Sequence, residues 1–558
     1  MQTSNSSNYR ILRSILSKTR RMDFSQDVSY LIIYSFLYKY ASDILKDYFL
    51  TVTEDKSITL DEAYENEECR QSLRRDALNM FGYFINDSDF FIDDVINNEY
   101  SERFFIYEFF TAFSEHVEFD TSSNYEKYFT FIFDAVKSEI NFRKFEFEGE
   151  NHLIVKDIIF SISKLNVMDE EYPFERVFAQ ICSSALVSAD SDPDYVNQML
   201  SEIIMDAKRD AEDIYAPFMN DASSLITLKN SMSWRKSYGK CPDKITYCAA
   251  IVKMFLNDFD LDGVFVEFSS PFESAGIGGA SFDVIISRIP QLTPKNIKRL
   301  NKTQNIQRVK NTKRIQLQNL LTDKFDMSED SVLSDEVNSA IEDLINKMDL
   351  EKDFAVEFEG EYEVLKDSEY LFLINLIASL VDDGIMAVSM PQSFLFKNSL
   401  ETLRKYLTVE INCIDAVISL PDEFSRPKTS DIIVIFRKNR VSGDIVFIDM
   451  SKNYSSKRLP DAVPGLFKRN MIFSPDTIAH VMEVLNKRKA VDKFSNVVDI
   501  EEIEKNEFNL AISRYVDTFE GEFISLRDLK YQKQELDENL ERLNKKIDGM
   551  MSDLKIRF

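Results

Sequence analysis

Phe282-Asp283-Val284-Ile285-Ile286-Ser287 is a short apolar run with the length and composition of a buried strand. Comparable runs occur at residues 263–268, 385–390, 414–419, 431–437 and 445–449. Stretches with apolar residues at helical spacing stand between them, at 244–258 and 369–382. Because strands that alternate with helices usually form one layered unit, the sequence predicts the α/β class, with a largely parallel sheet covered on both faces.

The chain is expected to have several parts, since 558 residues with 44% hydrophobic content can bury more than one core. Residues 1–206 combine helical spacing with few Gly and Pro, which predicts an N-terminal helical domain. We assign the α/β domain to 207–290 and 368–470, interrupted by a polar, partly basic insertion at 291–367. A connecting segment at 471–523 and a C-terminal coiled-coil helix at 524–558 complete the expected organisation.

Acidic residues outnumber basic ones, and the formal net charge of −28 repels the phosphate backbone of DNA. A nucleic-acid role therefore requires a local basic surface or a basic partner. The insertion begins with a basic stretch that contains Lys295, Lys298, Arg299, Lys302, Arg308, Lys310, Lys313 and Arg314. Such a stretch can follow DNA phosphates, and the alternative is a solvated loop without a ligand.

Metal, disulfide and membrane functions are not indicated by the sequence. The five cysteines form no CxxC pair and only three histidines are present, so neither a disulfide framework nor a zinc site is expected. Residues 1–21 lack the apolar centre of a secretory signal, and the apolar runs are shorter than the roughly 20 residues that cross a bilayer. We expect a cytoplasmic protein.

The last part of the chain carries an apolar heptad seam. Its members follow steps of three and four residues, broken at Lys533, and are Leu526, Leu529, Leu536, Leu540, Leu543, Ile547, Met550 and Leu554. This spacing predicts a coiled-coil helix whose seam must be buried against another apolar helix. That helix belongs either to a partner protein or to this chain, folded back as a hairpin.

Several separated stretches occur in the order of a known family. They are Arg21-Met22-Asp23-Phe24, residues 384–391 and 414–421, and Phe508-Asn509-Leu510-Ala511-Ile512-Ser513-Arg514-Tyr515 just before the seam. Together they resemble the modification subunit of type I restriction-modification systems, an adenine-specific DNA methylase family. The resemblance implies a Rossmann-like sheet that binds S-adenosylmethionine, and a specificity-type subunit as the partner of the coiled coil.

The family's cofactor motif is an Asp-Pro pair followed by a glycine-rich turn, in which glycines let the backbone approach the cofactor. The resemblance aligns this motif with Ile214-Tyr215-Ala216-Pro217-Phe218-Met219-Asn220-Asp221-Ala222-Ser223. Ala216 stands for the aspartate, Pro217 is kept, and Asn220, Asp221, Ala222 and Ser223 replace the glycine-rich turn. The family's ribose-binding carboxylate aligns with Cys241, whose plainer interpretation is a buried packing residue. Ser269 and Ser270 stand where the family has its adenine contact, near Glu267.

The family's catalytic motif, Asn-Pro-Pro and an aromatic residue, accepts protons from the target amino group and stacks on the flipped base. Here the aligned positions after the 282–286 run hold Arg288, Ile289, Pro290 and Gln291. Arginine only donates hydrogen bonds, and glutamine has no aromatic face. Arg288 is therefore better interpreted as a structural ion-pair partner or a phosphate contact.

These replacements favour a catalytically degenerate relative of the modification subunit that acts as a scaffold or regulatory partner. The first alternative is an active adenine methyltransferase whose glycine-rich stretch is Gly276-Ile277-Gly278-Gly279. That stretch precedes a strand rather than following one, so its context does not fit a cofactor loop. The second alternative is an acidic protein that mimics DNA, which the net charge would suit.

Overall fold

The structure is a computed structural model, and it describes residues 6–19, 26–56, 58–97, 105–142, 150–182, 193–269, 280–289, 355–358, 361–364, 372–421, 431–452, 454–458, 471–517, 530, 533–534, 536–543 and 545. Two compact units are distinguished, Met1–Val516 and Asp517–Phe558. Among the described residues, no helix is long and apolar enough to span a membrane.

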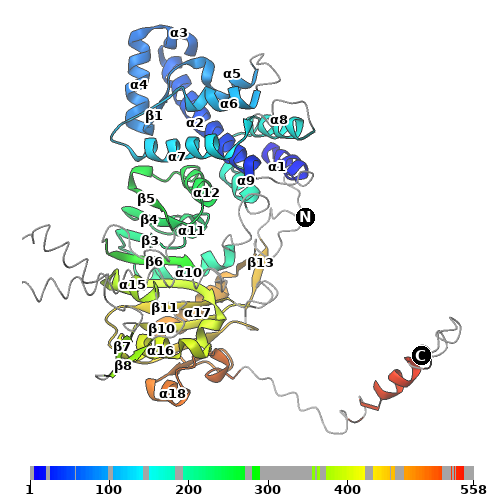
Figure 1. Cartoon of the computed structure of the whole chain (residues 1–558), viewed down its shortest axis with the longest axis vertical. Coiled ribbons are helices and arrows are strands. Elements are labelled where there is room, and N and C mark those ends of the chain that lie inside the picture. Colours follow the sequence, from blue (N-terminus) through cyan, green and yellow to red (C-terminus); the bar gives the residue numbers. More distant parts are fainter. Residues whose placement is uncertain are drawn as a thin grey trace, which may run out of the picture. The chain divides into compact units, whose positions relative to one another are not determined.

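The amino-terminal part of the larger unit is helical, as the spacing of its apolar residues predicts (Figure 1). Its helices are α1 (Ser7–Thr19), α2 (Gln26–Lys56), α3 (Leu60–Glu65), α4 (Glu67–Phe81), α5 (Ile92–Asn97), α6 (Phe105–Ser114), α7 (Asn124–Glu139), α8 (Glu150–Ser163) and α9 (Phe174–Ile181). Aromatic side chains fill the core around α2, where the rings of Tyr38 and Phe113 stack at 4.6 Å. A short hairpin of β1 (Tyr83–Ile85) and β2 (Val117–Phe119) was not predicted.

The α/β part is built on one sheet with the strand order β15-β12-β10-β11-β9-β6-β3-β4-β5. Its strands are β3 (Asp213–Ala216), β4 (Lys236–Cys241), β5 (Val264–Phe268), β6 (Phe282–Arg288), β9 (Leu380–Pro391), β10 (Ile414–Ser419), β11 (Asp431–Arg437), β12 (Ile445–Asp449) and β15 (Ser495–Val498). The neighbours from β5 to β9 are parallel, whereas β11 runs antiparallel to both β9 and β10. The expected α/β class and largely parallel sheet are confirmed.

Each face of the sheet contributes to a different hydrophobic core, because side chains alternate along a strand. Ile214 and Val284 join the core that also contains the helical domain, whereas Tyr215 and Ile285 join the core on the other face. The helices associated with the sheet are α10 (Asp194–Ala207), α11 (Ser223–Lys229), α12 (Lys244–Phe255), α15 (Phe372–Ala378), α16 (Glu401–Lys405), α17 (Pro475–Lys487) and α18 (Ile500–Lys505).

The expected elements differ from the structure in other places as well. The helix expected over 369–382 is shorter, because α15 ends at Ala378 and β9 begins at Leu380. A short apolar run does not distinguish helix from strand by its periodicity, which explains the error. A hairpin of β7 (Ala355–Phe358) and β8 (Glu361–Val364) lies within the insertion, separate from the main sheet.

The segment after the sheet is held in place by a buried arginine. The Arg404 guanidinium donates to the carbonyl oxygens of Phe508, Phe394 and Lys397 at 2.6, 3.1 and 2.9 Å. Nearby, the rings of Tyr515 and Phe447 stack at 4.4 Å. The 508–515 stretch, one of those that resemble the family, is thus packed against the larger unit near its end.

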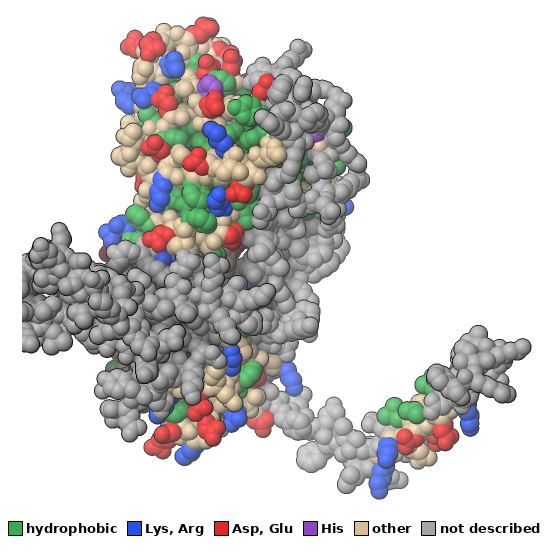
Figure 2. Space-filling view, viewed as in Figure 1, with side chains coloured by type: hydrophobic (Ala, Val, Ile, Leu, Met, Phe, Trp, Pro, Cys, Tyr) green, Lys and Arg blue, Asp and Glu red, His purple; other side chains and the backbone are tan. Residues whose placement is uncertain are grey.

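The smaller unit contains helical residues between Lys530 and Lys545. Three members of the heptad seam, Leu536, Leu540 and Leu543, are described there and are 67%, 60% and 57% exposed. Hydrophobic side chains are visible on this helix in the space-filling view (Figure 2). The helix is present as predicted, whereas the coiled coil itself stays a prediction.

Candidate functional site

The turn after β3 keeps a backbone shape that glycine normally adopts. Asn220 and Ala222 have φ angles of 47° and 60°, in the left-handed region, and α11 begins directly afterwards at Ser223. These are two of the positions that the resemblance aligns with glycines. Non-glycine residues pay a conformational cost there of about 1 kcal/mol each. The backbone of the turn therefore adopts the left-handed torsion angles typical of glycine, although the residues at these positions carry Cβ atoms.

Neighbouring strands hold this turn closely. The Phe218 N–H donates to Ser287 Oγ at 3.1 Å, and the Ser287 hydroxyl donates to the Phe218 carbonyl oxygen at 2.9 Å. The Met219 N–H donates to the Lys240 carbonyl oxygen at 3.1 Å. The Met219 side chain lies so close to Gly239 that a Cβ added there would be 2.4 Å from its sulfur atom. The residues of the turn are thus packed against the carboxyl ends of β4 and β6.

A buried ion pair lies under the turn. The Lys253 ammonium, on α12, is 2.8 Å from Asp221 Oδ2, and it also donates to Ser223 Oγ. Both side chains are more than nine-tenths buried. Burial opposes ionisation of Asp221, but the Lys253 charge and the hydrogen bonds from Lys253 and Ser223 together outweigh it and lower the pKa of this carboxyl. Burial raises the pKa of nearby Asp194, at the start of α10, to about 6 despite the attraction of Lys253.

Cys241 ends β4 and is fully buried. Its Sγ atom is 3.9 Å from the carbonyl oxygen of Asn220, and burial raises the pKa of the thiol. The thiol is therefore neutral at physiological pH and offers no charged acceptor for ribose hydroxyls. This burial agrees with the packing interpretation of Cys241.

The neighbouring strand positions carry an ion pair that the sequence did not reveal. Lys240 Nζ, buried within β4, lies 3.1 Å from Glu267 Oε2 on β5. The two residues are register partners in the parallel pair, so their side chains leave the same face. The Glu267 side chain thus points toward Lys240.

Arg288 forms a structural ion pair at the end of β6. Its Nη2 and Nε atoms lie 3.0 and 3.2 Å from Asp431 Oδ2, and Asp431 is the first residue of β11. Both side chains are nearly nine-tenths buried. Ile289 follows as a buried residue whose N–H donates to the Ser389 carbonyl oxygen at 2.7 Å. Arg288 thus has the ion-pair partner that one of its two interpretations predicts, and contact with a phosphate stays a prediction.

The structure brings most of the expected residues to the carboxyl edge of the sheet. Pro217, Phe218, Asn220, Ala222, Cys241 and Arg288 follow or end β3, β4 and β6. Pro290, Gln291, the 276–279 glycines and the basic stretch lie outside the described residues, so DNA contact through that stretch stays a prediction. Sequence reasoning placed Asp221 in the turn without its ion pair and missed the roles of Ser287 and Lys253, although a lysine in the apolar 244–255 helix was a usable signal of a buried partner.

Comparisons with known proteins agree with this fold. The family model described as N-6 DNA Methylase matches residues 293–522, a range that begins after Arg288. The MpnII type I restriction enzyme methylase subunit of Mycoplasma pneumoniae is 27% identical over 216 residues, 38% of each chain. The MjaVIII methylase subunit of Methanocaldococcus jannaschii is 36% identical over 131 residues, 23% of this chain and 21% of that one. The alignments thus span well under half of these relatives' lengths.

Solved structures extend the likeness of fold over nearly the whole chain. The methyltransferase subunit of a type I restriction-modification system from Streptococcus thermophilus superimposes with a TM-score of 0.63 at 19% identity, covering 92% of this chain and all of that one. A second structure, from a study of complex assembly in the type I system, has a TM-score of 0.51 at 12% identity and full coverage of both chains.

The sheet and the matched segment define the class of this protein: it has the Rossmann-like α/β fold of S-adenosylmethionine-dependent methyltransferases. Within that class it resembles the adenine-specific DNA methylase family, and in particular the modification subunits of type I restriction-modification systems. The family's cofactor is S-adenosylmethionine.

The left-handed backbone of the turn gives a direct test of its strain. We expect Ala222→Gly to raise the free energy of unfolding by up to about 1 kcal/mol, because glycine removes the Cβ penalty. In a matched control, Ala249→Gly within α12 should lower it by about 1 kcal/mol or more. Urea denaturation of both variants checks the prediction, and equal losses in both would contradict it.

Proposed function

We propose that this protein is a non-catalytic relative of the type I modification subunit that serves as a scaffold or regulatory partner. The observation that carries the proposal is that the cofactor turn is occupied by the chain's own side chains. Asp221 is engaged by Lys253, and Met219 packs on Gly239. Each contact is made within the protein, so the turn needs no cofactor to complete its packing.

The residues present do not fit S-adenosylmethionine as the family binds it. Ala216 stands for the aspartate, and the buried Cys241 thiol stands for the ribose carboxylate. Losing a hydrogen bond to a charged acceptor costs roughly 1.5–3 kcal/mol, or about ten- to a hundred-fold in affinity. The Cβ atoms of Asn220 and Ala222 add bulk where the family has glycine. These losses act on the same ligand, so their combined effect on affinity is large.

The arrangement around Arg288 also opposes methyl transfer. A guanidinium cannot accept protons from a target amino group, whereas the family's asparagine can. A positive charge about 6 Å from the cofactor's sulfonium would repel it by roughly 3 kcal/mol at an effective dielectric near 20. Asp431 offsets part of this charge, but it also holds the guanidinium in place.

Calorimetric titration with S-adenosylmethionine tests the proposal. We expect no saturable heat at ligand concentrations that saturate an active family member run in parallel. The same titration with S-adenosylhomocysteine removes the sulfonium charge and so separates poor pocket shape from charge repulsion. Tight one-to-one binding of either ligand would overturn the non-catalytic assignment.

The second candidate is an active subunit of an adenine-specific methyltransferase. The observation in its favour is the turn itself, which keeps left-handed backbone at Asn220 and Ala222. Transfer of a labelled methyl group from S-adenosylmethionine to duplex DNA, by the protein alone and with a specificity-type subunit, distinguishes the candidates. Labelled DNA would establish this second candidate.

The exposed leucines of the smaller unit support a protein partner, with a specificity-type subunit as the expected one. Leu536, Leu540 and Leu543 lie at four- and three-residue steps and remain more than half exposed, which is costly for apolar side chains in water. We expect deletion of residues 526–558 to abolish co-purification with the partner. Replacing Glu538 and Glu541, off the seam, by glutamine should leave it unchanged, and an unaffected pull-down of the deletion variant would contradict the prediction.

A further inference from the structure

A pocket of about 270 Å³ lies at the amino ends of β4 and β5, away from the turn at their carboxyl edge. One wall comes from the end of α11 and the loop leading into β4, including Lys229, Trp234 and Arg235. The other comes from the loop between α12 and β5, including Asp258, Phe259 and Asp260. None of these residues belongs to the candidate cofactor site.

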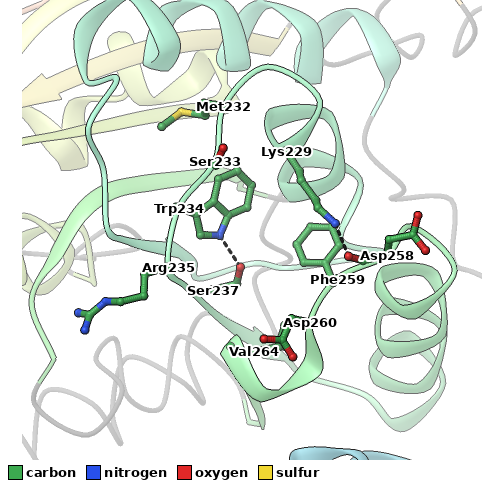
Figure 3. A pocket seen from close by; sticks show the side chains of 11 residues that line it. Lys229, Met232, Ser233, Trp234, Arg235, Ser237, Asp258, Phe259, Asp260 and Val264 are labelled. Atoms are coloured by element: carbon green, nitrogen blue, oxygen red, sulfur yellow. Dashed lines mark hydrogen bonds between the residues drawn. The ribbon is translucent and has the colours of Figure 1, made fainter. Parts of the chain in front are cut away.

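Two aromatic rings form the centre of the pocket (Figure 3). Trp234 and Phe259 meet edge to face with their centroids 6.2 Å apart. The Trp234 indole N–H donates to Ser237 Oγ at 2.7 Å, so its hydrogen-bonding capacity is already used. The indole can still bind a ligand through its π face, which attracts cations.

The two cationic side chains beside the rings both have partners within the protein. The Lys229 ammonium donates to the carbonyl oxygens of Asn257 and Asp258 and lies 4.4 Å from the Phe259 centroid. The Arg235 guanidinium pairs with Glu212 and Asp213 and points away from both rings (Figure 3). The two cations of the pocket are therefore already engaged.

The carboxylates of the pocket form no ion pair, although the Lys229 ammonium attracts both of them from beyond ion-pair distance. Asp258 accepts the Tyr40 hydroxyl at 2.8 Å, and Asp260 accepts the Asp262 N–H at 3.1 Å. In the part of the chain that the structure describes, no cationic side chain lies within ion-pair distance of either carboxylate. Asp258 is also held at a left-handed φ of 55°, a strained backbone that its loop maintains.

We propose that this pocket receives the guanidinium of an arginine side chain from a basic segment of a protein partner. A guanidinium can stack on the Trp234 indole and use its fork of N–H donors on a carboxylate, which the compact lysine ammonium does less well. The volume is below the roughly 300–1,000 Å³ of pockets that hold a whole small molecule, so it suits one side chain. The strongly acidic chain attracts such a partner over a longer range.

The single tryptophan makes binding directly observable. The probes are acetyl-Gly-Arg-Gly-amide and its lysine and citrulline analogues, titrated into the full-length protein while Trp234 fluorescence is followed. The arginine peptide should give a saturable change and the lysine peptide one at least about fivefold weaker. The citrulline peptide, neutral but of similar shape, should give none. An equal response to the arginine and citrulline peptides, or no saturable response to arginine, would overturn the proposal.

A pair of variants locates the site. Asp260→Asn keeps an oxygen to cap the Asp262 N–H but removes the charge, and it should weaken arginine binding about tenfold. Asp87→Asn is the matched control, because Asp87 caps the Asp89 N–H at the same 3.1 Å in the helical domain. It should leave binding unchanged, and equal effects of the two variants would refute the assignment. The assay contains neither methyl donor nor DNA, so its outcome is independent of the proposed function.

Discussion

Replacement of Lys253 by methionine is expected to lower the free energy of unfolding by about 3–5 kcal/mol. The variant keeps an unbranched side chain of similar length but leaves the buried Asp221 carboxylate without its cation. Leaving one buried charge unpaired costs far more free energy than the intact ion pair contributes, because the desolvation of that charge is no longer compensated. Chemical denaturation followed by circular dichroism measures the loss.

Two further variants identify the cause of that loss. In the double variant Lys253→Met with Asp221→Asn, the uncompensated charge disappears and we expect much of the stability to return. Lys244→Met is the matched control on the same helix, because Lys244 pairs with Glu139 where both side chains are over a third exposed. It should cost less than about 1 kcal/mol. If Lys253→Met also cost less than about 1 kcal/mol, the ion pair between Lys253 and Asp221 would not be what stabilises the turn.

The sequence was sufficient to predict the elements of the sheet whose apolar runs are long and bounded. The run at 282–287 became β6, and the 431–437 run became β11. The direction of β11 was not predictable, because its antiparallel pairing with β9 and β10 depends on connections and not on the strand's own residues. Likewise β15, from the expected connecting segment, is too short to be recognised from periodicity.

The sequence predicted the positions of the candidate site but not the partners that contact them. The resemblance indicated which positions depart from the family, including Ala216, Cys241 and Arg288, and a sequence comparison is well suited to that. It could not indicate which side chains the residues of the site contact, because Lys253 on α12 and Asp431 on β11 are brought to the site by the fold. Contacts between residues far apart in sequence are set by packing, so these partners required the structure.

Replacement of Arg288 by asparagine, the residue that the resemblance aligns with this position, is expected to destabilise the protein by about 3 kcal/mol without creating methyltransferase activity. The loss follows because Asp431, only 8% exposed, would remain charged without its partner. Under the proposed function, activity is not expected, because the turn and Cys241 would still lack the contacts by which the family holds the methyl donor. Thermal or urea denaturation and a labelled-methyl transfer assay measure the two outcomes separately.

Arg437→Asn is the matched control for this variant, since Arg437 also extends from the sheet to pair with an aspartate. Its partner Asp415 lies 3.2 and 2.8 Å from Arg440 and Arg488 as well, so the carboxylate keeps cations when Arg437 is removed. We expect a loss below about 1 kcal/mol there. If Arg288→Asn instead gained S-adenosylmethionine-dependent activity, the cofactor pocket would have to be competent, and only the catalytic position would be degenerate. If it cost no stability, the ion pair with Asp431 would not be the reason that arginine occupies this position.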